Sequence, residues 1–442
     1  MSLPRYPEYK DSGVEWLGEL PRHWSVCRYK EIFSERDERS VDGAEQLLSV
    51  SAYTGVTPRA EGLADGEFLS RAESLEGYRV CYPDDLVINI MLAWNRGLGV
   101  SKHHGIVSPA YSVFRVIGAE DPRYLDYMVR SDRSILYYKA FSAGVIDSRL
   151  RLYPDTFASL YCGLPPLGEQ RLIANFLDRE TARIDALIAE QEKLLALLAE
   201  KRQATISHAV TRGLDPNVPM KDSGIAWLGE VPAHWEVGPL KHWVVFKSGG
   251  TPSKDRVDYW GGDIPWASAK DLKAELLMDT IDHLAPEAVE DGAATTLPAG
   301  VVLVVVRGMI LARMFPVSLT LVPMAINQDL KGLLPKQGLE AEYLASLLRG
   351  TADQSLQRLD EAGHGTKALR MDAWASMELP IPPVDEQRQI ANFLAQRIEA
   401  LDELSREARA AIELLRERRT ALISAAVTGQ IDVRNVVGER VA

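Results

Sequence analysis

The sequence predicts a duplicated α/β protein of mixed α+β type, in which two domains are joined by two long helices that pack on each other as a coiled coil. Three observations support this prediction. The 442 residues are enough for about three average domains, two separate segments each occur twice, and each copy of the second segment reads as one long amphipathic helix. Because a duplicated domain usually packs about a pseudo-twofold axis, we expect the two halves to be related in that way.

The first repeated segment is KDSGVEWLGELPRHW at Lys10–Trp24, which returns as KDSGIAWLGEVPAHW at Lys221–Trp235, 211 residues later. The second opens PPLGEQRLIANFL at Pro165 and returns as PPVDEQRQIANFL from Pro382, 217 residues later. This period is too long for a solenoid, whose repeats have roughly 20–50 residues. We therefore expect two variable domains at residues 1–164 and 216–381, two repeated helical segments at 165–215 and 382–432, and a C-terminal tail at 433–442.

The repeated helical segment contains neither Pro nor Gly between Glu169 and His208, and its apolar residues recur in steps of four and three. The expected seam consists of Ile173, Leu177, Ile184, Leu187, Leu194 and Leu198, and, 217 residues later, of Ile390, Leu394, Leu401, Leu404, Ala411 and Leu415. A seam of this length needs a partner, which favours packing of the two helices on each other. The alternative is that each helix lies on the core of its own domain.

The variable segments read as short strands broken by turns, with Asp85–Ile90, Ala110–Val116 and the apolar run Val301–Val306 as strands. Their loops combine cations, amides, hydroxyls and aromatic rings, which can donate to phosphates, read base edges and stack on bases. The candidate DNA-binding residues are Trp94, Asn95, Arg96, Lys102, His103 and His104 in the first segment, and Lys247, Ser248, Thr251, Ser253, Lys254, Lys270, His364, Thr366 and Lys367 in the second. Solvated turns are the alternative reading of these loops. His103 and His104 could also bind a metal, although no Cys/His cluster with zinc spacing accompanies them.

Net charge, apolar runs, cysteine count and missing motifs limit the class of protein to which the chain can belong. The net charge of −12 does not exclude a nucleic-acid partner, because charge acts within a Debye length of about 8–10 Å. The longest apolar run is far shorter than a membrane span, no signal peptide is recognisable, and three cysteines are too few for a disulfide framework, so we expect a cytoplasmic protein. Neither a Walker loop, a zinc-protease motif, a serine-hydrolase elbow nor a dinucleotide fingerprint occurs, and we expect no catalysis.

Taken together, these motifs resemble the specificity (S) subunits of Type I restriction-modification systems. The resemblance rests on YKDSGVEWLGELPRHW and its return at Lys221, the PPxxEQRxIANFL start of each helix, the TPS…YWGGDIPW run at Thr251–Trp266, and HGTKALR…LPIPP before the second helix. It covers almost the whole chain. The family's DNA-contact residues do not align between recognition domains, so the resemblance assigns none here.

The resemblance implies two target recognition domains, each reading one half of a bipartite site in double-stranded DNA. The helices would form an antiparallel coiled coil that spaces the domains and docks two modification (methyltransferase) subunits, to which restriction/translocase subunits attach. The chain itself would bind no cofactor, because S-adenosylmethionine, ATP and Mg belong to the partner subunits, and no membrane is implied. Two other hypotheses remain open: a coiled-coil scaffold with duplicated protein-binding domains and no DNA, and a self-contained nuclease, for which no acidic metal triad is recognisable.

Overall fold

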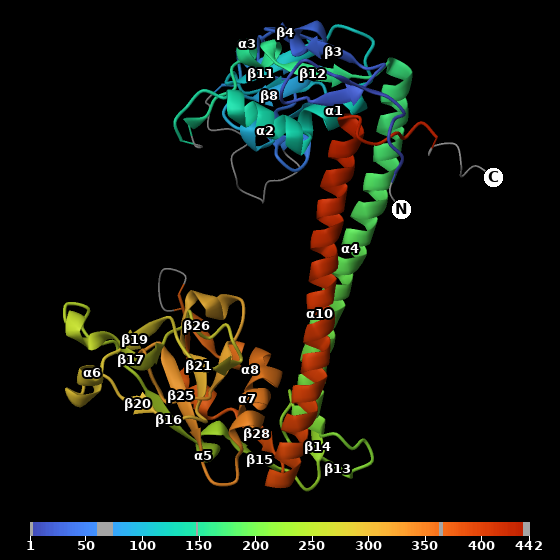
Figure 1. The fold of residues 1–442 in the computed structure, drawn as a ribbon. Helices are drawn as coiled ribbons and strands as arrows, with labels where there is room; N and C mark the ends of the chain where they lie inside the picture. The colour runs from blue at the N-terminus through green and yellow to red at the C-terminus, as the bar shows by residue number, and fades with distance from the viewer. Residues whose placement is uncertain (1–2, 60–73, 147–148, 362–365, 436–442) are drawn as a thin grey trace. The chain divides into compact units, whose positions relative to one another are not determined.

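The computed structural model describes residues 3–59, 74–146, 149–361 and 366–435. The chain forms two compact units, Met1–Glu192 with Ala410–Ala442 and Lys193–Arg409, so that each unit contains part of both long helices (Figure 1). Each unit is a mixed α/β domain, and the two long helices α4 (Leu167–Arg212) and α10 (Val384–Val427) pack together. The predicted fold class is confirmed. Among the described residues, no helix combines the length and the apolarity that a membrane span requires.

The first unit is built around an antiparallel sheet in the order β4-β11-β8-β9, and its core includes Leu86, Ile88 and Phe114. Its strands are β1 (Tyr9–Asp11), β2 (Glu19–Pro21), β3 (Ser25–Arg28), β4 (Phe33–Arg36), β5 (Leu48–Ser51), β6 (Gly55–Pro58), β7 (Arg79–Cys81), β8 (Leu86–Asn89), β9 (Leu98–Val100), β10 (Gly105–Val107), β11 (Tyr111–Val116) and β12 (Tyr161–Leu164). Its short helices are η1 (Tyr29–Glu31), η3 (Ala93–Asn95), α1 (Pro122–Arg130), α2 (Asp132–Phe141) and α3 (Pro154–Ser159).

The second unit has a five-stranded sheet in the order β16-β25-β21-β23-β18 and a four-stranded sheet in the order β19-β17-β24-β20. Its strands are β13 (Met220–Asp222), β14 (Glu230–Pro232), β15 (Glu236–Pro239), β16 (Val244–Ser248), β17 (Trp260–Ala267), β18 (Leu276–Leu277), β19 (Asp282–Leu284), β20 (Thr296–Leu297), β21 (Val302–Val305), β22 (Arg307–Gly308), β23 (Val317–Thr320), β24 (Met324–Ile326), β25 (Leu330–Pro335), β26 (Leu359–Glu361), β27 (Lys367–Leu369) and β28 (Glu378–Ile381). Its short helices are α5 (Leu240–Trp243), η5 (Val257–Tyr259), α6 (Pro286–Glu290), η6 (Met309–Ala312), α7 (Ala341–Gly350), α8 (Ala352–Leu356) and α9 (Met371–Ala375). The apolar run Val301–Val306 is buried and contains β21, near the middle of the larger sheet.

Each variable segment begins and ends on one pair of antiparallel strands. In the first unit β3 pairs with β12, and in the second β15 pairs with β28. The first strand of each pair follows the first repeated segment, Lys10–Trp24 or Lys221–Trp235, which we call the opening motif. The second strand precedes the Pro-Pro start of a long helix. A variable segment therefore leaves and returns at one place, which allows its interior to differ while its ends stay the same.

The two long helices run antiparallel. Asp185 of α4 pairs with Arg419 of α10 at 2.9 Å, and Arg202 of α4 pairs with Asp402 at 3.4 Å. From Asp185 to Arg202 the residue number on α4 increases by the same amount by which it decreases from Arg419 to Asp402 on α10. That relation holds only for antiparallel neighbours.

The seam between these helices differs from the predicted one at three leucines and at Ala411, whose place is taken by the buried Ile412. Leu187, Leu194 and Leu404 are 46%, 41% and 48% exposed. The less exposed positions that continue the steps of four and three are Thr181, Ile184, Ile188, Gln191, Leu195 and Leu198 on α4, and Leu394, Ile398, Leu401, Ser405, Ala408, Ile412 and Leu415 on α10. The prediction chose the wrong member of Leu187-Ile188 and Leu194-Leu195, because adjacent apolar residues do not show which one faces the partner. It also passed over Ser405, because a small polar residue in a seam carries no apolar signal.

The opening motif of the first unit packs on the first turn of α4 through a buried carboxylate. Glu169 accepts hydrogen bonds from the Tyr6 hydroxyl at 2.6 Å and from the Trp24 indole N–H at 3.0 Å, and His23 Nε2 lies 2.6 Å from its second oxygen. Tyr6 and Trp24 are 4% and 0% exposed. A single side chain from the EQR motif thus holds two groups of the opening motif, His23 and Trp24, and Tyr6 just before it.

The second unit repeats this junction with fewer hydrogen bonds. Glu386 lies 2.7 Å from His234 Nε2, but the buried indole N–H of Trp235 has no hydrogen-bond partner among the described residues. The Glu386 side chain is 24% exposed, whereas that of Glu169 is 6% exposed. The same motif is therefore bound more tightly in the first unit.

The glutamine of each EQR motif joins the long helix to a shorter one. The backbone N–H of Asp121, at the start of α1, donates to Gln170 Oε1 at 3.0 Å, and that of Glu340, at the start of α7, donates to Gln387 Oε1 at 2.8 Å. In both units the glutamine amide also donates to a carbonyl of the preceding Pro-Pro pair, at 2.9 and 2.8 Å. These shared contacts explain why the motif is repeated while the variable segments diverge.

Candidate nucleic-acid interface

In the second unit, several predicted loops converge on one edge of the five-stranded sheet. Ser248 at the end of β16 lies opposite Lys331 at the start of β25, and Val305 at the end of β21 lies opposite Leu330. The segment after β16 and the segment after β21 therefore leave the sheet at the same edge. This brings Lys247–Lys254 close to Arg307, which follows β21 in the chain.

Hydrogen bonds hold the Lys247–Lys254 loop against this edge. Lys331 Nζ donates to Ser248 Oγ, and Thr251 Oγ1 donates to Gln328 Oε1 at 2.6 Å. A Cβ on Gly249 would lie 1.8 Å from the Ile326 carbonyl oxygen, so only glycine lets the loop backbone pass so closely. The loop is therefore a fitted part of the sheet edge.

Further along the loop, Ser253 Oγ accepts the N–H of Asp255 at 3.3 Å, and the Ser253 carbonyl accepts the Trp260 indole N–H at 3.2 Å. Lys247, Thr251, Ser253 and Lys254 are all exposed. Lys270 is exposed on a turn that follows β17, and the N–H of Asn327 donates to the Ala267 carbonyl at 3.0 Å. This hydrogen bond joins the end of β17, which the Lys270 turn follows, to Asn327, which precedes β25 at the same edge of the sheet.

Lys367 reaches the edge through strand β27. Lys367 lies opposite Gly308 in the β22–β27 pair, and its Nζ donates to Glu361 Oε1 at 2.5 Å. The hydrogen bond from Lys367 lowers the pKa of Glu361. Arg307, in the same strand as Gly308, donates to Asp329 Oδ1 at 3.0 Å. Thr366 is partly buried just before β27, and His364 lies outside the described residues.

Sequence reasoning missed the residues of η6 and its end at this edge. Met309 and Met314 are 72% and 51% exposed, and Arg313 is exposed with no side-chain partner recorded in the described parts of the chain. The run RGMILARMF is mostly apolar and gave no signal of a surface loop. Arg358 and Arg370 lie in the same hairpin region, where burial, aided by the charge of Arg370, lowers the pKa of Arg358.

In the first unit, the two predicted groups of DNA-binding residues, Trp94–Arg96 and Lys102–His104, lie apart. Leu86 lies opposite Val100 and Ile88 opposite Leu98, so β8 and β9 run antiparallel. Trp94, Asn95 and Arg96 belong to the loop at one end of this pair, and Lys102, His103 and His104 follow β9 at the other end. The two sets therefore do not form one surface, because the hairpin places them at opposite ends of its strands.

Two of the residues in the Trp94–Arg96 loop already have partners within the protein. Arg96 adopts a left-handed conformation with φ of 62°, its Nη1 donates to the Arg130 carbonyl at 2.9 Å, and it pairs with Asp132. Burial, with the nearby charges of Arg130 and Arg419, lowers the pKa of Arg96. Trp94 donates to the Met91 carbonyl at 2.9 Å, whereas Asn95 is exposed.

The Lys102–His104 turn lies beside an aromatic group. The His104 ring centroid is 4.8 Å from that of Tyr82, over which the Arg36 guanidinium lies at 4.6 Å. The His103 N–H donates to Ser101 Oγ at 3.0 Å, and Lys102 is exposed. No group of three or more His, Cys, Asp or Glu side chains in the described residues is placed to bind a metal, so the metal-ligand alternative for these histidines gains no support.

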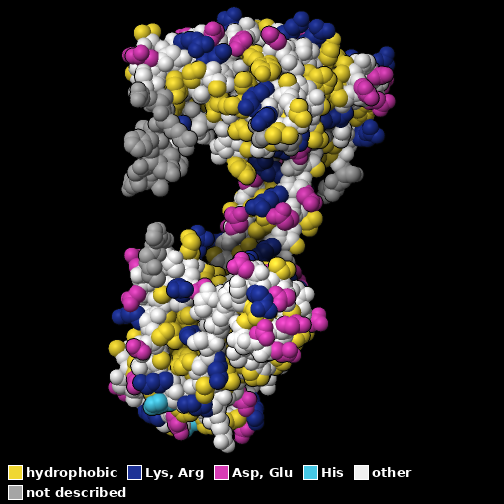
Figure 2. All heavy atoms as spheres, turned by 90° about the vertical axis from the view of Figure 1, so that its left-hand side faces the viewer, with side chains coloured by type: hydrophobic (Ala, Val, Ile, Leu, Met, Phe, Trp, Pro, Cys, Tyr) yellow, Lys and Arg dark blue, Asp and Glu magenta, His cyan; other side chains and the backbone are white. Residues whose placement is uncertain are grey.

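Exposed residues near the first sheet were also missed. Tyr53, in the turn between β5 and β6, is 93% exposed, and Arg130 Nη2 donates to its carbonyl at 3.1 Å. Val145 and Ile146 are 99% and 53% exposed in a segment closed by the bridge Ala143↔Arg151. On the face drawn in Figure 2, Lys and Arg side chains are interspersed with Asp and Glu. Any attraction for DNA phosphates would therefore arise locally, at individual loops.

Comparison with known proteins gives the class of this architecture. Residues 232–414 match the family described as the Type I restriction modification DNA specificity domain. Over 168 residues the chain is 30% identical to the EcoR124I/EcoR124II specificity subunit of Escherichia coli, a match that covers 38% of this chain and 40% of that relative. The match therefore spans about two fifths of the relative's own length.

Two solved structures share the fold. A chain from the structure described as the structural basis underlying complex assembly and conformational transition of the type I R-M system aligns with a TM-score of 0.71 and 16% identity, over 92% of this chain and 98% of the other. The crystal structure of the HsdS subunit from Thermoanaerobacter tengcongensis aligns with a TM-score of 0.53 and 16% identity, over 93% and 98%. In sequence over part of its length, and in fold over most of it, the chain is similar to the specificity (HsdS) subunits of Type I restriction-modification systems.

Proposed function

We propose that this chain supplies the DNA sequence specificity of a Type I restriction-modification complex, and that each variable segment reads one half of a bipartite site. The observation that carries the proposal is the duplicated junction. Two copies of one frame, built from the same Glu, Gln, His and Trp positions, hold two variable sheets with different loops. A frame that stays constant while its loops diverge suits recognition of two different sequences.

The chemistry of the sheet edges supports DNA as the ligand. The second unit presents Lys247, Lys254, Lys270 and Arg313 as exposed cations around one edge, and Thr251 and Ser253 as hydroxyls. Cations bind phosphates and guanine edges, and hydroxyls and amides accept or donate to bases. In the first unit Asn95 and Tyr53 are exposed, near the charged group of Arg96 and Arg130.

We also propose that residues 165–215 and 382–432 set the spacing of the recognition domains 1–164 and 216–381 and dock two modification subunits, through which restriction subunits join. The exposed leucines Leu187, Leu194, Leu197, Leu404 and Leu414 support this role, because leucines beside a helix seam offer apolar area to a further protein. S-adenosylmethionine, ATP and Mg would then be bound by those partners, in the cytoplasm.

The test maps methylated bases across the genome of a cell that contains the chain with its modification partner, compared with a cell lacking the chain. We expect methylation at one bipartite sequence only when the chain is present. Arg313→Ala should weaken or relax methylation at one half-site and leave the other unchanged. Lys336→Ala is the matched control, because Lys336 is an exposed cation just beyond the opposite end of β25, where its Nζ bonds to the carbonyls of Lys241 and His242. Methylation that is independent of the chain would support the protein-scaffold alternative instead.

A further inference from the structure

Two of the three cysteines face each other across the strand pair that closes the first unit. Cys27 of β3 is the direct partner of Cys162 of β12, and their sulfur atoms are 3.7 Å apart. Both are free thiols. The Tyr29 N–H donates to the Leu160 carbonyl two residues along the ladder, so by alternation Cys27 and Cys162 form a hydrogen-bonded pair. Such pairs have Cα atoms about 5.5 Å apart, inside the range of about 4.4–6.8 Å found in disulfides.

We propose that Cys27 and Cys162 are a redox modification site, a dithiol that hydrogen peroxide oxidises to a reversible cross-strand disulfide. This inference depends on the structure of the first unit alone and is independent of the proposed DNA specificity. The disulfide would join the strand that begins the variable segment to the strand that ends it. It would therefore close the whole segment between Cys27 and Cys162 into a covalent loop at its attachment to α4.

The two thiols have different chemical roles. Cys27 is partly exposed and can meet the oxidant, whereas Cys162 is 2% exposed. A hydrogen bond from the Cys162 thiol lowers the pKa of Cys27 despite its partial burial, and the same bond together with burial raises the pKa of Cys162. Because the thiolate is the nucleophile, Cys27 is the residue that attacks first.

The reaction balances with peroxide as the oxidant. The Cys27 thiolate attacks one peroxide oxygen, the O–O bond breaks, and the other oxygen leaves as hydroxide and is protonated to water. The resulting sulfenic acid is attacked by Cys162 sulfur, whose proton goes to the departing hydroxide as a second water. Two thiols thereby lose two electrons and two protons, and one peroxide becomes two waters.

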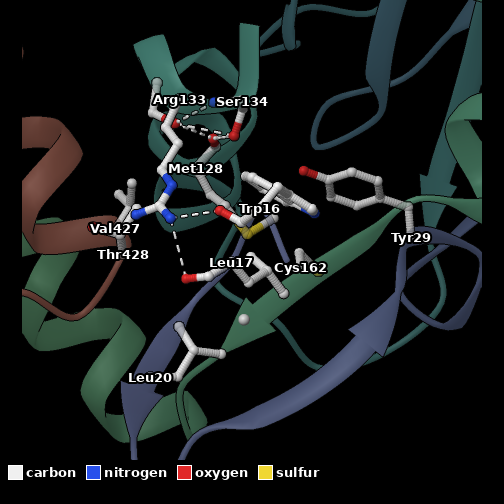
Figure 3. Close-up of a pocket in the computed structure, with 12 residues that line it drawn as sticks. Trp16, Leu17, Leu20, Tyr29, Met128, Arg133, Ser134, Cys162, Val427 and Thr428 are labelled. Carbon is white, nitrogen blue, oxygen red and sulfur yellow. Dashed lines mark hydrogen bonds between the residues drawn. The ribbon is translucent and has the colours of Figure 1, made fainter. Parts of the chain in front are cut away.

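A small cavity lies beside Cys162. Cys162 lines a cavity of 20 Å³ together with Trp16, Leu20 and Met128, which are shown in Figure 3. This volume is enough for about one water molecule, so the side chain is not tightly enclosed on that side. Because Cα atoms of such a strand pair are already about 5.5 Å apart, within the range of disulfides, closing the sulfur–sulfur distance from 3.7 Å to about 2.05 Å does not require the strands to separate.

The pair is a property of the first unit only. At the equivalent place in the second unit, Gly238 lies opposite Leu379. The third cysteine, Cys81, is 0% exposed, and burial raises its pKa to about 12. Cys81 is therefore a matched internal control, a buried thiol with no cysteine partner.

The experiment treats the reduced, full-length chain with hydrogen peroxide, unfolds it in denaturant so that buried thiols become accessible, alkylates the remaining thiols, and measures intact mass and cross-linked peptides. We expect two of the three thiols to become unreactive, the mass to fall by two hydrogens, the peptides of Cys27 and Cys162 to be joined, and dithiothreitol to restore both thiols. Cys81→Ser should behave in the same way. Cys27→Ser should form no internal cross-link, and because Cys27 is partly exposed this variant should fold.

Thermal unfolding supplies a second measurement. The oxidised wild-type chain should unfold at a higher midpoint than the reduced chain, and Cys27→Ser should show no such difference. The proposal is overturned if Cys27 proceeds to sulfinic acid or forms disulfides between chains while Cys162 stays alkylatable. It is also overturned if all three thiols remain reactive toward the alkylating agent when the peroxide-treated chain is unfolded in denaturant.

Discussion

Removing the Glu169 carboxylate should destabilise the protein far more than removing its repeat counterpart, Glu386. In Glu169→Ala, the Tyr6 hydroxyl and the Trp24 indole N–H lose their acceptor while both remain buried. Each buried donor left without a partner costs about 1–3 kcal/mol, so we expect a loss of roughly 2–6 kcal/mol for the pair. The His23 side chain is 39% exposed, and its interaction adds about 1 kcal/mol at most.

Glu386→Ala is the matched control. Within the described parts of the chain, it removes only the polar contact with His234, whose side chain is 45% exposed, and the Trp235 indole already lacks a hydrogen-bond partner there. We expect a loss of about 0–1 kcal/mol. In a unit of this size each kcal/mol shifts the unfolding midpoint by about 2–4 °C. Glu169→Ala should therefore lower it by roughly 10 °C and Glu386→Ala by about 4 °C or less.

The assay is thermal unfolding of the full chain, combined with hydrogen exchange of peptides from each opening motif. The first motif should lose protection in Glu169→Ala, while the second should remain protected. Equal losses from the two substitutions would refute the reasoning, because they would show that the buried hydrogen bonds to Tyr6 and Trp24 contribute nothing beyond the shared histidine contact.

Four further predictions address recognition, spacing and pH. Lys367→Ala or Arg313→Ala should cost about 1–3 kcal/mol of binding by the assembled complex if the side chain contacts a base, and should reduce the salt dependence if it contacts a phosphate; titration at several salt concentrations separates the two cases. Arg96→Ala should also lower the unfolding midpoint, because Arg96 bonds to Arg130 and Asp132, which a melting curve will show. A four-residue insertion after Ala199 in α4 should lengthen the helix by about 6 Å and the preferred spacer by about one or two base pairs, with both half-sites unchanged in methylation maps. Burial by itself raises the pKa of Asp121, but hydrogen bonds from Arg123 and the Tyr124 N–H hold this pKa below its usual value. The ionised carboxylate should therefore stabilise the folded state above about pH 4, and this stabilisation should be lost as the pH falls through the lowered pKa. Acid unfolding of Asp121→Asn should lack this pH-dependent loss of stability.

A structural feature could be predicted from the sequence when the residues that determine it lie within one segment of the chain. The helix ranges were predictable because Pro, Gly and apolar steps of four and three lie within the segment that forms the helix. The seam itself was predicted only in part, since Leu187 and Ile188 are equally apolar and only the position of α10 distinguishes them. Strand pairing decided which loops share an edge, and it joined Lys367 to the sheet edge of Ser248 while it separated Trp94 from Lys102.

The sequence by itself determined the duplication, the family resemblance and the two long helices, because repeats and heptad steps are visible without knowledge of distant contacts. Only the tertiary structure decided that Glu169 binds three groups where Glu386 binds one, that Arg313 stands exposed beside the predicted loops, and that Cys27 faces Cys162. These features depend on residues far apart in the chain meeting across a strand pair or a helix end. Their burial and hydrogen bonding follow from that meeting, which composition and spacing do not encode.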